Sequence, residues 1–323
     1  MLLWHVHGSW THSFVQGPHR YLLPVNGDRD ADGRGLCGRD WPAAHEVDVE
    51  ALRRCDIDCV VLQRPEELTL VADLLGRHPG ADIPAVYVEH NAPRPHPVDS
   101  RHPLADRTDI PLVHVTDFNQ LMWDSGMAPD TVITHGIADP GQLYSGEVRA
   151  AATMINEPIR RARTVGTDLL PGLAAHLPID VWGIGSQALN DPAHRVTAVT
   201  GRGDLSHRTL LPEIARRVVY LHTARWTSLG LSLVEAMYLG MPVVAVAGTM
   251  APLVVPAEAG VVSADIPTLA RALTDFADDP SAAHRAGKAA REYAIAHFSL
   301  DRFLQQWDDV IDVVCAGKEY ATC

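Results

Sequence analysis

Residues 225–246 read RWTSLGLSLVEAMYLGMPVVAV, a stretch that combines a loop, a glycine turn, a helix and a buried strand. Small residues before Leu231 predict a tight turn, the apolar spacing that follows predicts a short helix, and Gly240-Met241-Pro242 ends it before a strand. A loop that leads into a helix presents unpaired backbone N–H groups and the positive end of the helix dipole, which together suit a phosphate. Glu235 lies one turn into this helix, where its carboxylate can accept hydrogen bonds from a ribose diol. The stretch therefore predicts an α/β fold with a nucleotide site; an ordinary crossover with a solvated Glu235 is the alternative.

Strand and helix patterns alternate along the chain. Short apolar runs that end in turn residues predict strands at 2–7, 22–25, 56–62, 83–88, 111–115, 131–134, 149–156, 179–183, 196–199, 218–222, 243–246 and 260–262. The helical apolar period predicts helices at 66–77, 118–125, 168–176, 210–216, from 231, and at 266–277, 281–297 and 300–314, while 8–11 and 26–40 are expected to be loops. Two such blocks predict two doubly wound domains, and ligands in such sheets bind outside the carboxyl ends of the strands, so we expect the site in a cleft between the blocks.

The composition excludes several classes of function. The formal net charge of −13 argues against a nucleic-acid backbone or an anionic membrane as the main partner. No apolar run approaches the roughly 20 residues of a membrane span, and the first residues lack the pattern of a secretory signal. The five cysteines match neither a disulfide framework nor a zinc pattern, so we expect a cytoplasmic protein. The loop at 28–33 resembles the start of a calcium loop, but Arg39 replaces its last ligand, so a metal site is not expected there.

The stretch at 225–246 resembles the sugar-nucleotide site of the retaining family-4 glycosyltransferases, which have the GT-B fold. In that family two glutamates separated by seven residues flank a Gly-Phe-Gly-Leu-like turn. Here Glu235 stands at the second glutamate, Thr227 at the first, and Ser228-Leu229-Gly230 at the turn. The resemblance implies an α/β GT-B fold: an acceptor-side Rossmann-like domain at 1–143, a nucleotide-sugar-binding domain at 144–298, and a terminal helix at 299–323 that returns to the first domain.

Further motifs carry the same resemblance. Arginines at 160, 161 and 163 stand where the family holds the donor diphosphate with an Arg and a Lys, although Val165 replaces the lysine before Gly166. His90, at the end of a predicted strand, is similar to a family histidine that faces the donor sugar or the acceptor, and His135 begins a turn similar to an Asn-Gly-Ile-Asp turn of the family. The resemblance implies catalytic roles for His90, Arg161 and Thr227. The donor would be bound by Gly8, Arg160, Arg163, Gly203, Leu205, Ser228, Leu229, Gly230, Leu231 and Glu235.

The function that these expectations favour is metal-independent transfer of a sugar from a UDP- or GDP-linked donor to a small-molecule or glycan acceptor, with retention of the anomeric configuration. The donor is a co-substrate and no cofactor is expected. Because Thr227 and Val165 replace a carboxylate and a cation, a catalytically silent sugar-nucleotide-binding protein is an alternative. A sugar-nucleotide epimerase is a further alternative, but its acid and base carboxylates are not apparent.

Overall fold

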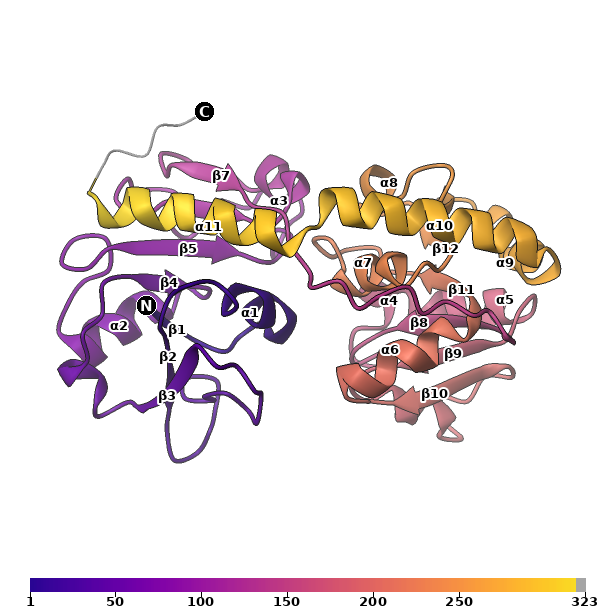
Figure 1. Ribbon diagram of the computed structural model, residues 1–323, viewed down its shortest axis with the longest axis horizontal. Helices are drawn as coiled ribbons and strands as arrows, with labels where there is room; N and C mark the ends of the chain where they lie inside the picture. The colour runs from indigo at the N-terminus through magenta and orange to yellow at the C-terminus, as the bar shows by residue number, and fades with distance from the viewer. Residues whose placement is uncertain (318–323) are drawn as a thin grey trace. The chain divides into compact units, whose positions relative to one another are not determined.

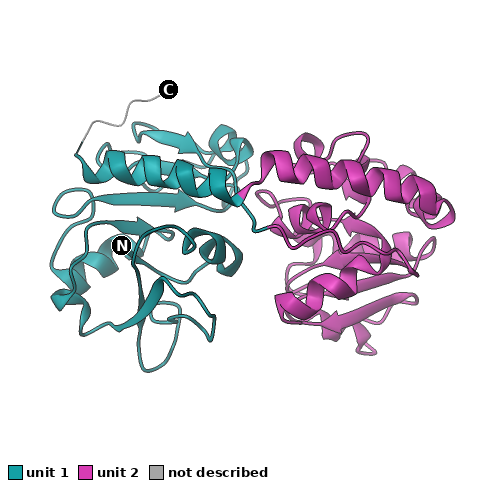
Figure 2. Cartoon of the chain, viewed as in Figure 1, with its two compact units in different colours: residues 1–138, 300–323 teal, residues 139–299 magenta. Residues whose placement is uncertain are grey.

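The computed structural model describes residues 1–317 and divides into two compact units (Figure 2). Unit 1 holds Met1–Ala138 and the described residues from Leu300 onward, and unit 2 holds Asp139–Ser299. The first junction lies a few residues before the expected boundary at 143. The reason is local, since Tyr144 N–H donates to the carbonyl of Leu239 at 3.0 Å and Arg291 pairs with Asp139 at 2.6 Å.

Unit 1 is built on a seven-stranded sheet in the order β3-β2-β1-β4-β5-β6-β7, with every neighbouring pair parallel. Its strands are β1 Leu2–Leu3, β2 Tyr21–Val25, β3 Ala44–Asp48, β4 Val60–Leu62, β5 Ala85–Glu89, β6 Leu112–His114 and β7 Asp130–Val132. Its helices are α1 Gly8–Phe14, η1 Leu52–Arg54, α2 Glu67–Leu75, α3 Asp117–Met122 and α11 Leu300–Cys315. The strand order reverses between β1 and β4, and ligands of doubly wound sheets bind beyond the carboxyl ends at such a point.

Helices cover both faces of the unit 1 sheet, because successive strand residues point to opposite sides. Leu3, Val61 and Val86 face a core that includes Trp10 of α1 and Trp307 of α11. The alternate residues face a second core, which includes residues of η1 and α2. Trp10 and Trp307 lie edge to face with ring centroids 5.6 Å apart, so aromatic packing holds α11 against unit 1. Figure 1 draws α11 as the yellow helix of this unit.

Unit 2 is built on a six-stranded parallel sheet in the order β10-β9-β8-β11-β12-β13. Its strands are β8 Val148–Met154, β9 Ile179–Trp182, β10 Val199–Gly203, β11 Arg217–His222, β12 Val243–Val246 and β13 Gly260–Ser263. Its helices are α4 Ala162–Val165, η2 Thr167–Leu169, α5 Leu170–Ala174, η3 Ser186–Asn190, α6 His207–Ala215, α7 Leu231–Tyr238, α8 Ala251–Val254, α9 Ile266–Asp278 and α10 Pro280–His297. When the six strands are numbered along the chain, their order across the sheet is 3-2-1-4-5-6, which is the Rossmann arrangement. The order reverses between β8 and β11.

Four expectations about elements were wrong. The first strand stops at Leu3, because the chain turns there and the Val6 N–H donates to the carbonyl of Trp4 at 3.0 Å. Residues 8–11 belong to α1 rather than to a loop, and the Thr11 N–H donates to the carbonyl of His7 at 2.8 Å. The strand expected at 196–199 begins only at Val199, because Ala198 has a left-handed backbone with φ +62°. The helix expected at 168–176 is split into η2 and α5.

Two further differences concern the edges of unit 1. Strand β3 was missed because it is a largely exposed edge strand with polar residues. The terminal helix expected at 299–323 packs on unit 1 as α11 and ends at Cys315. The part of that expectation at 318–323 lies outside the described residues.

Candidate functional site

The loop from β11 into α7 is fixed by Gly230, which adopts a φ of +76° immediately before the helix. A Cβ atom at this position would lie 2.8 Å from Cε1 of the buried His222, so a side chain is excluded both by backbone conformation and by space. The helix therefore begins at the carboxyl end of β11, beside the point where the strand order reverses. Its first-turn N–H groups and positive dipole end form the surface that the sequence predicted for a phosphate.

Glu235 lies on α7 with 8% of its surface exposed. Its Oε1 is 3.1 Å from Nε2 of His207, the first residue of α6. His207 was not predicted, because it precedes Glu235 by 28 residues and belongs to a different helix, so no local spacing links the two. The side chain of Glu235 is nearly enclosed while that of His207 is about half exposed, so the imidazole is the partner that a ligand can replace.

The basic stretch at 160–163 lies against the β11–α7 loop. Arg225 and Trp226 donate their backbone N–H groups to the carbonyl of Thr164 at 2.9 and 3.3 Å, and Thr223 Oγ1 donates to the carbonyl of Val165 at 2.7 Å. Gly166 makes this contact possible, because a Cβ there would lie 2.1 Å from the carbonyl oxygen of Thr223. The structure thus brings the loops after β8 and β11 together.

Carboxylates hold the arginines of this region. Arg160 pairs with Glu157, and Arg163 reaches Asp168 at 3.1 Å. Arg225, which the sequence analysis did not select, donates two hydrogen bonds to Asp168 at 2.6 and 2.9 Å. Two guanidinium groups therefore share one carboxylate, which leaves local positive charge for an anion. Arg161 precedes α4, where its backbone N–H donates to the carbonyl of Glu157 at 2.9 Å.

The other predicted donor residues occupy different settings. Thr227 and Leu231 are half-buried, Ser228 is buried, and Leu229 is only 1% exposed, so Leu229 can offer only its backbone to a ligand. Gly203 ends β10 with φ +84° and donates its N–H to Ser186 Oγ at 2.9 Å, with Leu205 following in the loop. Gly8 is the first residue of α1 and belongs to unit 1, whereas the other predicted donor residues belong to unit 2.

His90 is buried at the carboxyl end of β5 in unit 1. Gln63 Nε2 donates to the carbonyl of Trp4 at 2.7 Å, which turns Gln63 Oε1 toward His90 Nε2 at 3.0 Å. Because an amide oxygen only accepts, His90 carries a proton on Nε2. Gln63 was not predicted, although a polar residue directly after the apolar run of β4 was a usable signal.

Two further histidines surround His90. Its ring centroid lies 4.0 Å from that of His7 and 6.5 Å from that of His135. Exclusion of water lowers the pKa of His7 to about 4 and that of His135 to about 3, and it holds the pKa of His90 well below the usual range. The three imidazoles are therefore neutral near pH 7, and they offer hydrogen bonds rather than charge.

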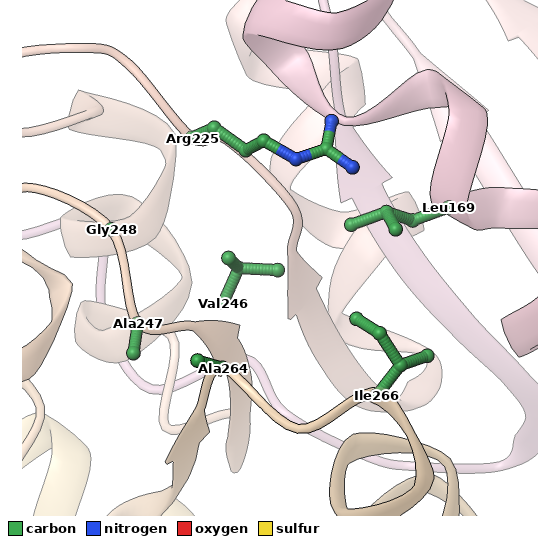
Figure 3. Close-up of a pocket in the computed structure, with 7 residues that line it drawn as sticks. All are labelled: Leu169, Arg225, Val246, Ala247, Gly248, Ala264 and Ile266. Carbon is green, nitrogen blue, oxygen red and sulfur yellow. The ribbon is translucent and has the colours of Figure 1, made fainter.

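A cavity of about 390 Å³ lies at the carboxyl ends of β12 and β13 (Figure 3). It is lined by Leu169, Arg225, Val246, Ala247, Gly248, Ala264 and Ile266. Arg225 brings a positive charge to this otherwise apolar lining, and through Asp168 it connects the cavity to the basic stretch. Within residues 1–317, no group of three or more His, Cys, Asp or Glu side chains is arranged to hold a metal ion.

Comparisons with known proteins bear on the fold. Residues 199–293, less than half of the chain, match the family described as Glycosyl transferases group 1. Sucrose-phosphate synthase from Thermosynechococcus elongatus superposes with a TM-score of 0.73 at 14% identity, over 98% of this chain and 99% of that one. Anabaena Alr3699/HepE, solved with UDP and glucose, superposes with a TM-score of 0.73 at 15% identity, over 96% of this chain and 99% of that one. The fold is GT-B.

A larger structure extends the similarity. TarM superposes with a TM-score of 0.65 at 16% identity over 82% of this chain, which spans 57% of the length of TarM. A mutant of S. aureus TarM, solved with Fondaparinux, alpha-GlcNAc-glycerol and UDP, superposes with a TM-score of 0.62, and this chain spans 58% of its length. No curated protein sequence matches the chain. The described residues include no helix with the length and apolar character needed to cross a membrane. The expected α/β fold of two Rossmann-like domains is confirmed.

Proposed function

We propose that this protein transfers a sugar from a UDP- or GDP-linked donor to a small-molecule or glycan acceptor, with retention of configuration and without a metal ion. The observation that carries the proposal is the buried carboxylate of Glu235, one turn into a helix that Gly230 starts at the carboxyl end of β11. The group 1 glycosyltransferase match includes this helix, and the solved structure of Alr3699/HepE holds UDP and glucose.

Each part of the donor has a candidate partner in unit 2. The ribose diol would replace His207 as the hydrogen-bond donor to Glu235, since hydroxyl groups can donate to a carboxylate as an imidazole does. The diphosphate would lie at the start of α7, near Ser228 and Leu231, with Arg160, Arg161 and Arg163 beside it. The base would pack near Gly203 and Leu205 at the end of β10.

Charge stabilisation is the main catalytic contribution in this proposal. As the glycosidic bond breaks, negative charge grows on the leaving phosphate, and fixed guanidinium groups and helix N–H groups stabilise it. Asp168 keeps Arg163 and Arg225 in place before the donor binds, which reduces the reorganisation needed during the reaction. Thr227 can supply one hydrogen bond to the donor sugar, and neutral His90 can supply a polar contact without attracting a second anion.

The decisive experiment is a calorimetric titration of the purified protein with UDP, GDP and their nucleosides, followed by incubation with UDP- and GDP-sugars and a panel of acceptors. We expect one diphosphate to bind and the corresponding sugar to be released or transferred. Failure of both diphosphates to bind would contradict the donor site itself.

A second candidate is a silent sugar-nucleotide-binding protein. Val165, which stands where the resembled family has a lysine, is 7% exposed and packs in the core of unit 2, so no cation can occupy that position. Thr227 likewise provides no carboxylate. Tight binding of an intact nucleotide sugar, with neither hydrolysis nor transfer over the acceptor panel, would favour this candidate.

A further inference from the structure

Two cysteines distant in sequence line one cavity of unit 1. Cys59 directly precedes β4 and is fully buried, whereas Cys315 is the last residue of α11 and is exposed. They meet because α11 packs across the sheet through Trp307 and Ile311. The cavity measures about 340 Å³, and the amino-terminal residue Met1 also lines it.

The two thiols differ in chemistry because they interact. A hydrogen bond from the Cys59 thiol to Cys315 stabilises the Cys315 thiolate and lowers the pKa of Cys315 to about 7, with a smaller contribution from the amino terminus. The same hydrogen bond, together with burial, raises the pKa of Cys59 well above its usual range. Cys315 is thus the exposed nucleophile, and Cys59 is a protected thiol within reach of it.

We propose that Cys59 and Cys315 form a site of reversible thiol oxidation whose reagent is a low-molecular-weight disulfide such as oxidised glutathione. The Cys315 thiolate attacks one sulfur of the reagent, a mixed disulfide forms, and one glutathione thiolate leaves. Cys59 then loses its proton to solvent and attacks Sγ of Cys315, which expels the second glutathione. The protein dithiol is oxidised to a disulfide, and the reagent disulfide is reduced to two thiols.

The arrangement distinguishes this pair from the other described cysteines. The Cys55 thiol donates to the carbonyl of Ala51 within its own turn, and the Cys37 thiol donates to the carbonyl of Arg34. Cys59 Sγ also lies 3.9 Å from the carbonyl oxygen of Val60, but Cys59 shares a cavity with a second thiol, that of Cys315. An accessible thiol of low pKa beside a resolving cysteine is the arrangement of redox-sensitive sites. The resulting disulfide bond would join the last residue of α11 to the residue that directly precedes β4.

The test treats the full-length protein with oxidised glutathione and maps disulfides by mass spectrometry under non-reducing conditions. We expect a Cys59–Cys315 link in the wild type that dithiothreitol reverses. In Cys59→Ser, Cys315 should instead keep a glutathione adduct, because no resolving thiol remains. In Cys315→Ser, Cys59 should stay unmodified, because the buried thiol cannot reach the reagent.

A Cys323→Ser variant is the matched control, because Cys323 lies near Cys315 in sequence. The Cys59–Cys315 link should form in it as in the wild type. A stable glutathione adduct on Cys315 in the Cys323→Ser variant, with Cys59 still reduced, would overturn the proposal. So would modification of Cys59 in Cys315→Ser at the wild-type rate.

Discussion

At the scale of single residues, the pair formed by Glu235 and His207 sets the first prediction. If ribose hydroxyls take the place of His207, Glu235→Ala should weaken binding of the preferred nucleotide by about 2–3 kcal/mol, the usual loss for hydrogen bonds to a charged group. Calorimetry with UDP and GDP measures this. His207→Ala is the matched control, and we expect it to bind the nucleotide as well as the wild type or better. Unchanged affinity in a folded Glu235→Ala protein would remove Glu235 from the ribose site.

The arginines give a second prediction at this scale. The diphosphate should bind about tenfold or more tightly than its nucleoside, because each charge-assisted hydrogen bond contributes roughly 1.5–3 kcal/mol. Salt should reduce this difference. Arg163→Ala should reduce it as well, whereas Arg149→Ala should not. Arg149 lies at the start of β8, the end of the strand opposite to the candidate site, and pairs with Asp278 of α9. Equal affinities for nucleoside and diphosphate would place the phosphate site elsewhere.

At the scale of elements, the start of α7 depends on Gly230. Gly230→Ala should lower the free energy of unfolding by about 1–3 kcal/mol, since alanine must adopt a strained left-handed backbone and its Cβ would meet His222. Gly172→Ala is the control. Gly172 lies in α5 with no atom near its missing Cβ, so alanine there should be neutral or stabilise by up to about 1 kcal/mol. Urea denaturation of both variants measures the difference, and equal stabilities would show that Gly230 is not conformationally required.

The elements also show what the sequence could predict. Apolar runs such as Val60–Leu62 and Val243–Val246 were recognisable because buried parallel strands are apolar on both faces. Strand β3 was not, because it lies at an edge and exposes polar residues such as Glu46. At the candidate site, Glu235 and Gly230 could be selected from the sequence, because the turn and the helix that contain them are adjacent in the chain. Gln63 and His207 act through contacts between distant elements, and spacing along a sequence carries no signal for those.

At the scale of the whole molecule, the buried histidines of unit 1 make stability depend on pH. Their pKa values are lowered in the folded state, so below about pH 6.5 the unfolded chain binds protons that the folded chain does not. The free energy of unfolding should therefore fall as the pH drops from about 6.5 to 4. His135→Asn cannot take up that proton and should show a shallower fall over the same range. Parallel slopes for variant and wild type would contradict this account.

The two units also carry separate parts of the proposed activity. His90 belongs to unit 1, whereas Glu235, the arginines and the start of α7 all belong to unit 2. His90→Ala should therefore leave nucleotide affinity within about twofold of the wild type, because the proposed nucleotide contacts lie in the other unit. Transfer should fall by about a hundredfold, the loss typical of removing one polar group that acts on the reacting centre.

Both quantities must be measured on one preparation, with calorimetry for the nucleotide and release of UDP or GDP for transfer. Gln63→Leu serves as the companion variant, because it removes the acceptor that holds His90 Nε2–H while leaving the imidazole in place. We expect its transfer rate to lie between those of His90→Ala and the wild type. If His90→Ala transfers sugar normally, unit 1 acts without His90. If it loses nucleotide affinity together with transfer, His90 supports donor binding rather than the reacting sugar or the acceptor, and its proposed role is wrong.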